Sequence, residues 1–259
     1  PPAAGAWSLA VFVTLPLDSA LGVPSPPGVS PWVLTTLYTL IAFLVWDLSR
    51  FLLHWAMHAI PTLWELHQVH HSAQVLTPLA FHRIHPLEST LHALRNIVTT
   101  GVLAGVAFWL FRGRATEWTV FGVHAVGFIF NALTGNLRHS HVWIRHGDRL
   151  ERWLLSPAQH QLHHAIDARY HHTNYGTWLA CWDRLAGTLQ LSPDTRPRGF
   201  GLSKPNHRPD HLLSALFKPM ASAARCLIAH RRQARMHGPR QAVCVGQRIN
   251  PPGRQATES

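Results

Sequence analysis

The chain is poor in charged residues. Asp, Glu, Lys and Arg make up 14% of its 259 residues, against roughly 25% in an ordinary soluble domain. Only 12 residues are acidic, and lysine occurs twice against 21 arginines. Together with 47% apolar residues and eleven tryptophans, this composition excludes a wholly disordered chain. The mean hydropathy of only +0.01 predicts that much of the chain lies outside the lipid of a membrane.

Several sequence patterns of known cofactor sites are missing. The three cysteines form no CxxC pair, which argues against an iron–sulfur or zinc-ribbon module. The chain has neither the glycine fingerprint of a dinucleotide fold nor the Glu-x-x-His pairs of soluble di-iron bundles. Position 55, after His54, is Trp and not Glu, so the HExxH base of a metalloprotease is absent as well.

Long apolar runs are present and predict membrane helices. The run from Trp32 to Met57 predicts one helix of about 25 residues, enough to cross a bilayer. Two further runs, 97–111 and 118–133, predict a helical hairpin around the turn Arg112–Arg114. Buried helices of a soluble protein are the alternative. We expect three regions: an apolar segment with a Pro-rich linker (1–31), a membrane-embedded catalytic domain (32–192) and a basic tail (193–259), part helix and disordered at its end.

Histidine is the most over-represented residue. Seven of the 21 histidines fall between His54 and His85, and eight between His139 and His172. The two arms of the hairpin run in opposite directions, so its two ends lie on the same side of the membrane. This brings both histidine windows to one face. Arginines flank that face, and the positive-inside rule then predicts a cytoplasmic location for it. The tail carries a net charge of +9, which suits an anionic lipid surface.

The spacing of these histidines predicts a metal site. The motif HxxxH occurs at His54, and HxxHH occurs twice, at His67 and His160. Positions i, i+3 and i+4 share one face of a helix, so each motif presents its imidazoles together. Imidazole is the commonest metal ligand in proteins. Eight to ten of them exceed the needs of one ion, which predicts two ions close together.

The motifs, taken in order, resemble one family. They are HxxxH, LWELHQVHHS (Leu63–Ser72), RIHPLE (Arg83–Glu88), RHSHV (Arg138–Val142), SPAQHQLHH (Ser156–His164), TNYG (Thr173–Gly176) and WDRLAGT (Trp182–Thr188). This set resembles the fatty acid hydroxylase/sterol desaturase superfamily of membrane di-iron enzymes. The resemblance implies an all-α integral-membrane helical bundle. A cytosolic histidine-rich helical cap would hold its dinuclear metal site.

The resemblance also implies site residues by position. No catalytic residue is expected beyond the metal ligands, which would be His54, His58, His67, His70, His71, His85, His139, His160, His163 and His164. Asn174 and Asp183 match supporting positions. His141, His172 and Ala186 depart from the usual family pattern, and these departures put the substrate class in doubt more than the activity.

The implied cofactors are two iron ions, with zinc possible in isolated protein, and dioxygen as co-substrate. The implied reaction hydroxylates or desaturates an unactivated C–H position of a sterol, fatty acyl, alkylglycerol or carotenoid lipid. The expected partners are that lipid, the bilayer and an external electron donor such as a ferredoxin or cytochrome b5-like protein. No nucleic acid is expected. The expected location is multi-pass in a bacterial inner membrane. A non-enzymatic metal-binding or transport protein and a catalytically degenerate scaffold stay open as alternatives.

Overall fold

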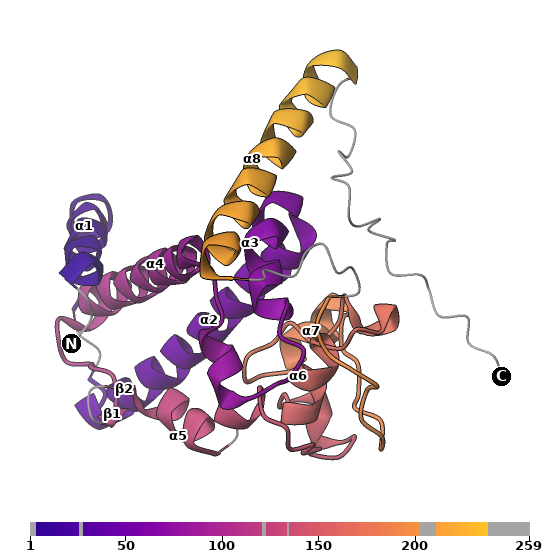
Figure 1. The fold of residues 1–259 in the computed structure, drawn as a ribbon. Coiled ribbons are helices and arrows are strands. Elements are labelled where there is room, and N and C mark those ends of the chain that lie inside the picture. The colour runs from indigo at the N-terminus through magenta and orange to yellow at the C-terminus, as the bar shows by residue number, and fades with distance from the viewer. Residues whose placement is uncertain (1–3, 26–27, 121–122, 134, 203–210, 238–259) are drawn as a thin grey trace.

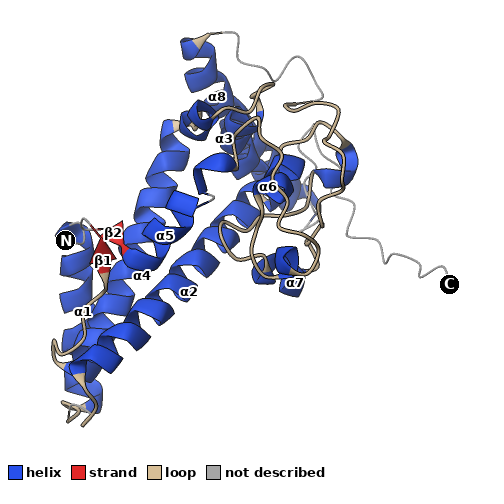
Figure 2. Cartoon of the chain, turned by 90° about the horizontal axis from the view of Figure 1, so that it is seen from below, coloured by secondary structure: helices blue, strands red, loops and turns tan. Residues whose placement is uncertain are grey.

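The computed structural model describes residues 4–25, 28–120, 123–133, 135–202 and 211–237. The regular structure of this part of the chain is helical, which confirms the prediction of an all-α fold. Its one departure is a pair of two-residue antiparallel strands, β1 (Thr119–Val120) and β2 (Val123–His124). The long helices α1, α2 and α4 lie at one end of the molecule, and the short helices α6 and α7 lie with their loops at the other (Figures 1 and 2).

Helix α2 (Pro31–Ala59) spans the first predicted run and carries HxxxH near its C-terminal end. Proline favours the first turn of a helix, and the Ser30 side chain accepts a hydrogen bond from the backbone N–H of Trp32. Ile60 is extended, as expected before a proline, and Pro61 then starts α3 (Pro61–His71). The two histidine motifs therefore follow each other across one tight bend.

Helix α4 (Pro86–Phe111) packs against α2 and ends where Arg112 adopts a left-handed conformation, φ 50°. Helices α2 and α4 are long and apolar enough to cross a bilayer, yet only 28% and 17% of their most apolar windows are buried within the protein. The core helix of a soluble protein would be mostly covered by its own fold. These two helices, which expose their apolar side chains, indicate a membrane protein.

Helix α1 (Ala4–Leu21) lies along α4 at very short range. A Cβ atom added at Gly101 would lie 2.8 Å from the Cβ of Leu9, and one at Gly105 would lie 2.7 Å from the Cβ of Val13. The Thr14 hydroxyl uses this closeness to donate a hydrogen bond to Gly105 O at 3.0 Å. Glycine is thus required at both α4 positions because the backbones approach each other there.

The second arm of the predicted hairpin differs from the expectation. The run 118–133 forms β1 and β2 and then α5 (Ala125–Leu133), a helix of nine residues that is too short to span a bilayer. Thr39 of α2 explains the break, because its hydroxyl accepts the backbone N–H of Trp118 and its carbonyl accepts His124 Nε2. The chain still returns along α2, so both histidine windows meet as predicted.

The remaining elements follow the bundle. Helix α8 (Leu212–His237) packs on α3 and includes Pro219 within its length. The predicted disorder at the end of the tail lies outside the described residues. The short elements are η1 (Pro78–His82), η2 (Gly135–Leu137), η3 (Leu150–Arg152), α6 (Pro157–His163), η4 (Ala168–Tyr170) and α7 (Cys181–Ala186).

Candidate metal centre

Nine histidines meet where α2, α3 and α6 end, and they form two groups. Within each group, one side-chain nitrogen of every member lies within 4.8 Å of those of the other members. The first group is His54, His58, His67, His71 and His163, and the second group is His70, His139, His160 and His164.

The two HxxHH motifs divide between the groups in a reciprocal way. In α3, the i and i+4 residues His67 and His71 join the first group, and His70 joins the second. At α6 the i and i+4 residues His160 and His164 join the second group, and His163 joins the first. Each motif therefore contributes to both groups, which places two sites side by side.

Helix α6 is short, and side-chain hydrogen bonds stabilise its N-terminus. Ser156 and Gln159 form a capping box, in which each side chain binds the other residue's backbone N–H. Gln159 also donates to the backbone of Glu151 and Gln190. This network fixes seven residues of helix that are too few to be stable alone.

The spacing within the second group matches ligands of one ion. Nε2 of His139 lies 3.1 Å from Nε2 of His70 and 3.0 Å from Nε2 of His160, which in turn lies 3.3 Å from Nε2 of His164. A neutral imidazole nitrogen carries either one hydrogen or one lone pair, so this chain of contacts cannot consist of separate hydrogen bonds. Ligands bonded to one ion at about 2.0–2.1 Å are about 3 Å apart.

Three of the five histidines of the first group have their tautomers set by acceptors outside the group. Nδ1 of His67 lies 2.8 Å from Oε1 of Glu88, Nδ1 of His54 lies 2.8 Å from Tyr175 O, and Nδ1 of His163 lies 2.7 Å from Thr173 O. Carbonyl and carboxylate oxygens accept, so each Nδ1 carries the hydrogen and each Nε2 keeps its lone pair. This is the arrangement by which proteins orient metal-binding histidines.

The inward-facing nitrogens lack protein partners. Nε2 of His58, His67, His71 and His163 is buried and makes no hydrogen bond. Burying a polar nitrogen without a hydrogen-bond partner lowers the stability of the folded chain. Burial, as the main cause, lowers the pKa of His70 to about 4 and that of His163 to about 3, so both rings are neutral at pH 7. The residues present therefore fit two nitrogen-bound metal ions.

The loop that orients His54 and His163 is held by two buried side chains. Asn174, with φ 56°, donates from its amide nitrogen to Gln159 O and Gln190 O and accepts the backbone N–H of Gln190. The Asp183 carboxylate accepts from the backbone N–H groups of Tyr175 and Gly176 and from the Thr188 hydroxyl. Both residues thus hold this loop in place and belong to neither histidine group.

His85 is placed elsewhere. Its Nδ1 accepts the Leu87 N–H at the start of α4, and its Nε2 donates to Leu216 O of α8 at 2.9 Å. It belongs to neither group, and neither do His141 and His172.

Sequence reasoning did not assign a role to two buried carboxylates. In the sequence, Glu88 stood out only as the last residue of the RIHPLE motif. Asp47 is fully buried and accepts from the backbone N–H groups of Trp178 and Leu179 and from Trp182 Nε1. These contacts join α2 to α7 and to the loop ahead of it. A lone acid inside an apolar run was the available signal, since a buried carboxylate requires such donors.

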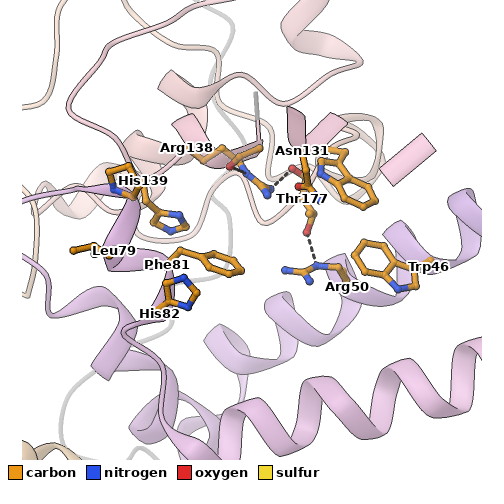
Figure 3. Close-up of a pocket in the computed structure, with 12 residues that line it drawn as sticks. Trp46, Arg50, Leu79, Phe81, His82, Asn131, Arg138, His139 and Thr177 are labelled. Atoms are coloured by element: carbon orange, nitrogen blue, oxygen red, sulfur yellow. Dashed lines mark hydrogen bonds between the residues drawn. The ribbon is translucent and has the colours of Figure 1, made fainter. Parts of the chain in front are cut away.

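Two cavities adjoin the groups. One of about 440 Å³ is lined by side chains that include Trp46, Arg50, Phe81 and Arg138 (Figure 3). A second, of about 240 Å³, shares the last three of these and is also lined by histidines of both groups, namely His54, His67, His70, His139 and His160. Both histidine groups are therefore accessible from a cavity that a ligand can enter.

Comparisons with known proteins agree with this site. A family model described as fatty acid hydroxylase matches residues 39–188. The chain is 27% identical over 179 residues to alkylglycerol monooxygenase of Homo sapiens, with 69% of this chain and 35% of the relative covered. It is 26% identical over 164 residues to ornithine lipid hydroxylase OlsE of Rhizobium tropici (63% and 45% covered). It is 29% identical over 169 residues to Delta(7)-sterol 5(6)-desaturase of Eremothecium gossypii (64% and 41% covered). The chain thus spans less than half the length of these relatives. No solved structure matches it significantly.

Proposed function

Since this chain belongs to the fatty acid hydroxylase family, we propose that it is an oxygen-dependent di-iron oxidoreductase that hydroxylates or desaturates a lipid. The observation that carries the proposal is the pair of histidine groups, to both of which the HxxHH motifs at α3 and α6 contribute. The printed names of its relatives, a monooxygenase, a lipid hydroxylase and a sterol desaturase, support oxidation of a lipid C–H bond.

The proposed ligands are the nine histidines of the two groups. Two iron ions, when bound there, would supply the activation of dioxygen that removal of hydrogen from an unactivated C–H bond needs. The chain itself would hold the ions. Glu88 and the carbonyls of Tyr175 and Thr173 would keep the Nδ1–H of His67, His54 and His163 in place and leave their Nε2 atoms free. His85, as placed here, would not be a ligand.

The lipid would reach the site from the bilayer. Helices α2 and α4 expose apolar side chains over most of their length, and the histidine groups lie at the C-terminal end of α2 and near the start of α4. A lipid could thus stay partly in the membrane while one carbon lies beside the metal groups. We place these groups on the cytoplasmic side, because arginines such as Arg83, Arg145 and Arg152 gather at that end.

Electrons would come from a separate protein of the ferredoxin or cytochrome b5 kind. The sequence carries no dinucleotide fingerprint and no cysteine pattern for an iron–sulfur cluster. A basic surface would attract an acidic donor, and this attraction weakens as salt rises.

Expression of the full chain in a bacterial host, followed by mass spectrometry of total lipids, tests this function. Growth under isotopically labelled dioxygen should give a lipid that gains one labelled oxygen, or one that loses two hydrogens. A His139→Ala variant should give neither. Identical lipid profiles for the wild type, the variant and the empty host would contradict the proposal.

A further inference from the structure

The cavity of about 440 Å³ carries an excess of positive charge that the metal chemistry does not use. Two of its lining residues, Arg50 from α2 and Arg138 from the loop after η2, are guanidinium groups. Both also line the smaller cavity beside the histidines. Figure 3 shows the two arginines on either side of Thr177, with Phe81 across the pocket. We call the residues Trp46, Arg50, Phe81, Arg138 and Thr177 the arginine pocket.

The positive charge of the two arginines is only partly balanced by the acidic residues that the structure describes. Within the described residues, no carboxylate forms an ion pair with either of them. Asp47 attracts both guanidiniums electrostatically without forming an ion pair with either, so two positive charges share one negative charge. Buried charges in proteins are normally paired, so the pocket lacks one anion.

The hydrogen bonds that the arginines do make leave donors free. Arg50 Nε donates to Thr177 Oγ1 at 3.1 Å, and its guanidinium lies 5.0 Å from the centre of the Trp46 ring. Arg138 donates from Nε to Gly135 O and from one terminal nitrogen to Thr177 O. The terminal nitrogens of Arg50 make no hydrogen bond within the described part of the chain. Thr177 therefore holds both guanidiniums in place and leaves N–H groups available to a ligand.

The remaining walls suit a hydrocarbon chain. Phe81 and Leu79 of η1 are exposed apolar side chains that line the same cavity, and Trp46 and Trp178 line it as well. A planar guanidinium is well matched to carboxylate and phosphate oxygens. An apolar surface beside two guanidiniums is complementary to an amphiphile with one negative end.

We propose that the arginine pocket binds the anionic head group, carboxylate or phosphate, of the lipid that this enzyme oxidises. The inference rests on the proposed function for the identity of the ligand as a lipid. Arg50 and Arg138 would hold the head, while Phe81 and Leu79 would contact the chain. The pocket would thus select the substrate by the charge of its head group. The position of the bound head group would determine which carbon of the lipid lies beside the histidine groups and is oxidised.

Binding without turnover tests the proposal. Isothermal titration calorimetry on the purified full chain in neutral-detergent micelles would use decanoate, decyl phosphate and the neutral decanol as probes, with empty micelles subtracted. We expect at least one anion to bind about tenfold or more tightly than decanol, the size of a charged hydrogen bond. Preference for decanoate would identify a fatty acid type of head, and preference for decyl phosphate a phospholipid type. Either supports the pocket.

Matched variants separate the pocket from general charge. Arg50→Gln and Arg138→Gln should each remove the preference for the anion and leave decanol binding unchanged. Arg95→Gln is the control, because Arg95 also lies against Trp46, 4.9 Å from its ring, but lines neither cavity. If Arg138→Gln does not fold, Arg50→Gln decides alone, with the thermal midpoint as the check on folding.

Three results would overturn the proposal. They are equal binding of anions and decanol by the wild type, equal loss of anion binding in Arg95→Gln and Arg50→Gln, and loss of anion binding on chelation, which would assign the anion to the metals. A chain that oxidises a lipid yet shows no anion preference would refute the pocket alone. A chain that binds anions through these arginines yet makes no oxidised lipid would refute the proposed function alone.

Discussion

The carboxylate of Glu88, in the first turn of α4, accepts a hydrogen bond from Nδ1 of His67, in the last part of α3, at 2.8 Å. Glu88 is 2% exposed, and its second carboxylate oxygen is buried without a partner. The contact joins a helix of the bundle to a helix of the metal centre. It also fixes the tautomer of a proposed ligand from outside the ligand set.

Replacing Glu88 by Gln should weaken metal binding about 10–100-fold, the usual cost of losing the acceptor behind a metal-bound histidine. Metal affinity, measured by competition with a chromophoric chelator, checks this. Glu65→Gln is the matched control. Glu65, in α3, is a buried acid like Glu88, but it accepts from Gln68 rather than from a histidine of either group. Equal losses in both variants would show that the effect is not specific to His67.

The assignment of adjacent histidines to different groups can be tested directly. His70→Ala removes one of four members of the second group, and His71→Ala removes one of five members of the first. Each should lower metal content toward about one ion per chain, because loss of a ligand weakens only the ion it binds. His85→Ala should keep the wild-type metal content. A large loss of metal in His85→Ala would return this residue to the ligand set.

The conformation of Asn174 predicts different effects for two substitutions. Asn174→Gly and Asn174→Ala both lose three hydrogen bonds, and each should lower the free energy of unfolding by about 1–3 kcal/mol. Alanine should cost about 1 kcal/mol more, because it is strained at φ 56° and glycine is not. Thermal midpoints of chelator-treated protein measure both. A more stable alanine variant would contradict the observed backbone conformation.

The stability of the metal-free chain should fall as pH falls below neutral. The pKa of His70 is about 4 and that of His163 about 3 in the folded chain, below the ordinary value of 6.5. A depressed pKa means that the stabilisation is complete above pH 6.5 and is lost as pH falls toward the folded-state values. Each such histidine contributes a slope of about 1.4 kcal/mol per pH unit in this window.

Thermal midpoints of chelator-treated protein between pH 7 and pH 5 check this dependence. Substitution of His70 or His163 by Gln should make the slope shallower, because glutamine takes up no proton in this range. A midpoint that stays constant across the range in the wild type would argue against neutral, buried imidazoles.

Much of this site was predictable from the sequence, and the rest depends on tertiary contacts. The 3.6-residue period placed each HxxHH motif on one helix face. It could not show that His70 joins a different group from His67 and His71, because that depends on how α3 and α6 face each other. The role of His85 was also hidden, since a histidine before a proline can cap a helix as readily as bind a metal.

The fold shows the same division. The extent of α2 was predictable because it follows from two local features of the sequence, namely the length of one apolar run and the prolines at its ends. The run 118–133 read as a single helix, although its β-branched residues around Val120 and Val123 favour extended structure. The hydrogen bonds that stabilise the break are accepted by Thr39, which lies in a distant part of the chain. The backbone carbonyls of Thr173 and Tyr175 orient His163 and His54. Every residue has such a carbonyl, so these contacts could not be predicted from residue type.

The metal-to-chain ratio of the 259-residue chain, purified in neutral detergent from iron-supplemented cells, tests the central claim most directly. Elemental analysis beside amino-acid quantification gives this ratio without any assumption about substrate. The two histidine groups predict two ions per chain in the wild type and almost none in the His70→Ala/His71→Ala double variant. A wild-type ratio of one or less, or a ratio of two that survives the double substitution, would contradict the dinuclear centre.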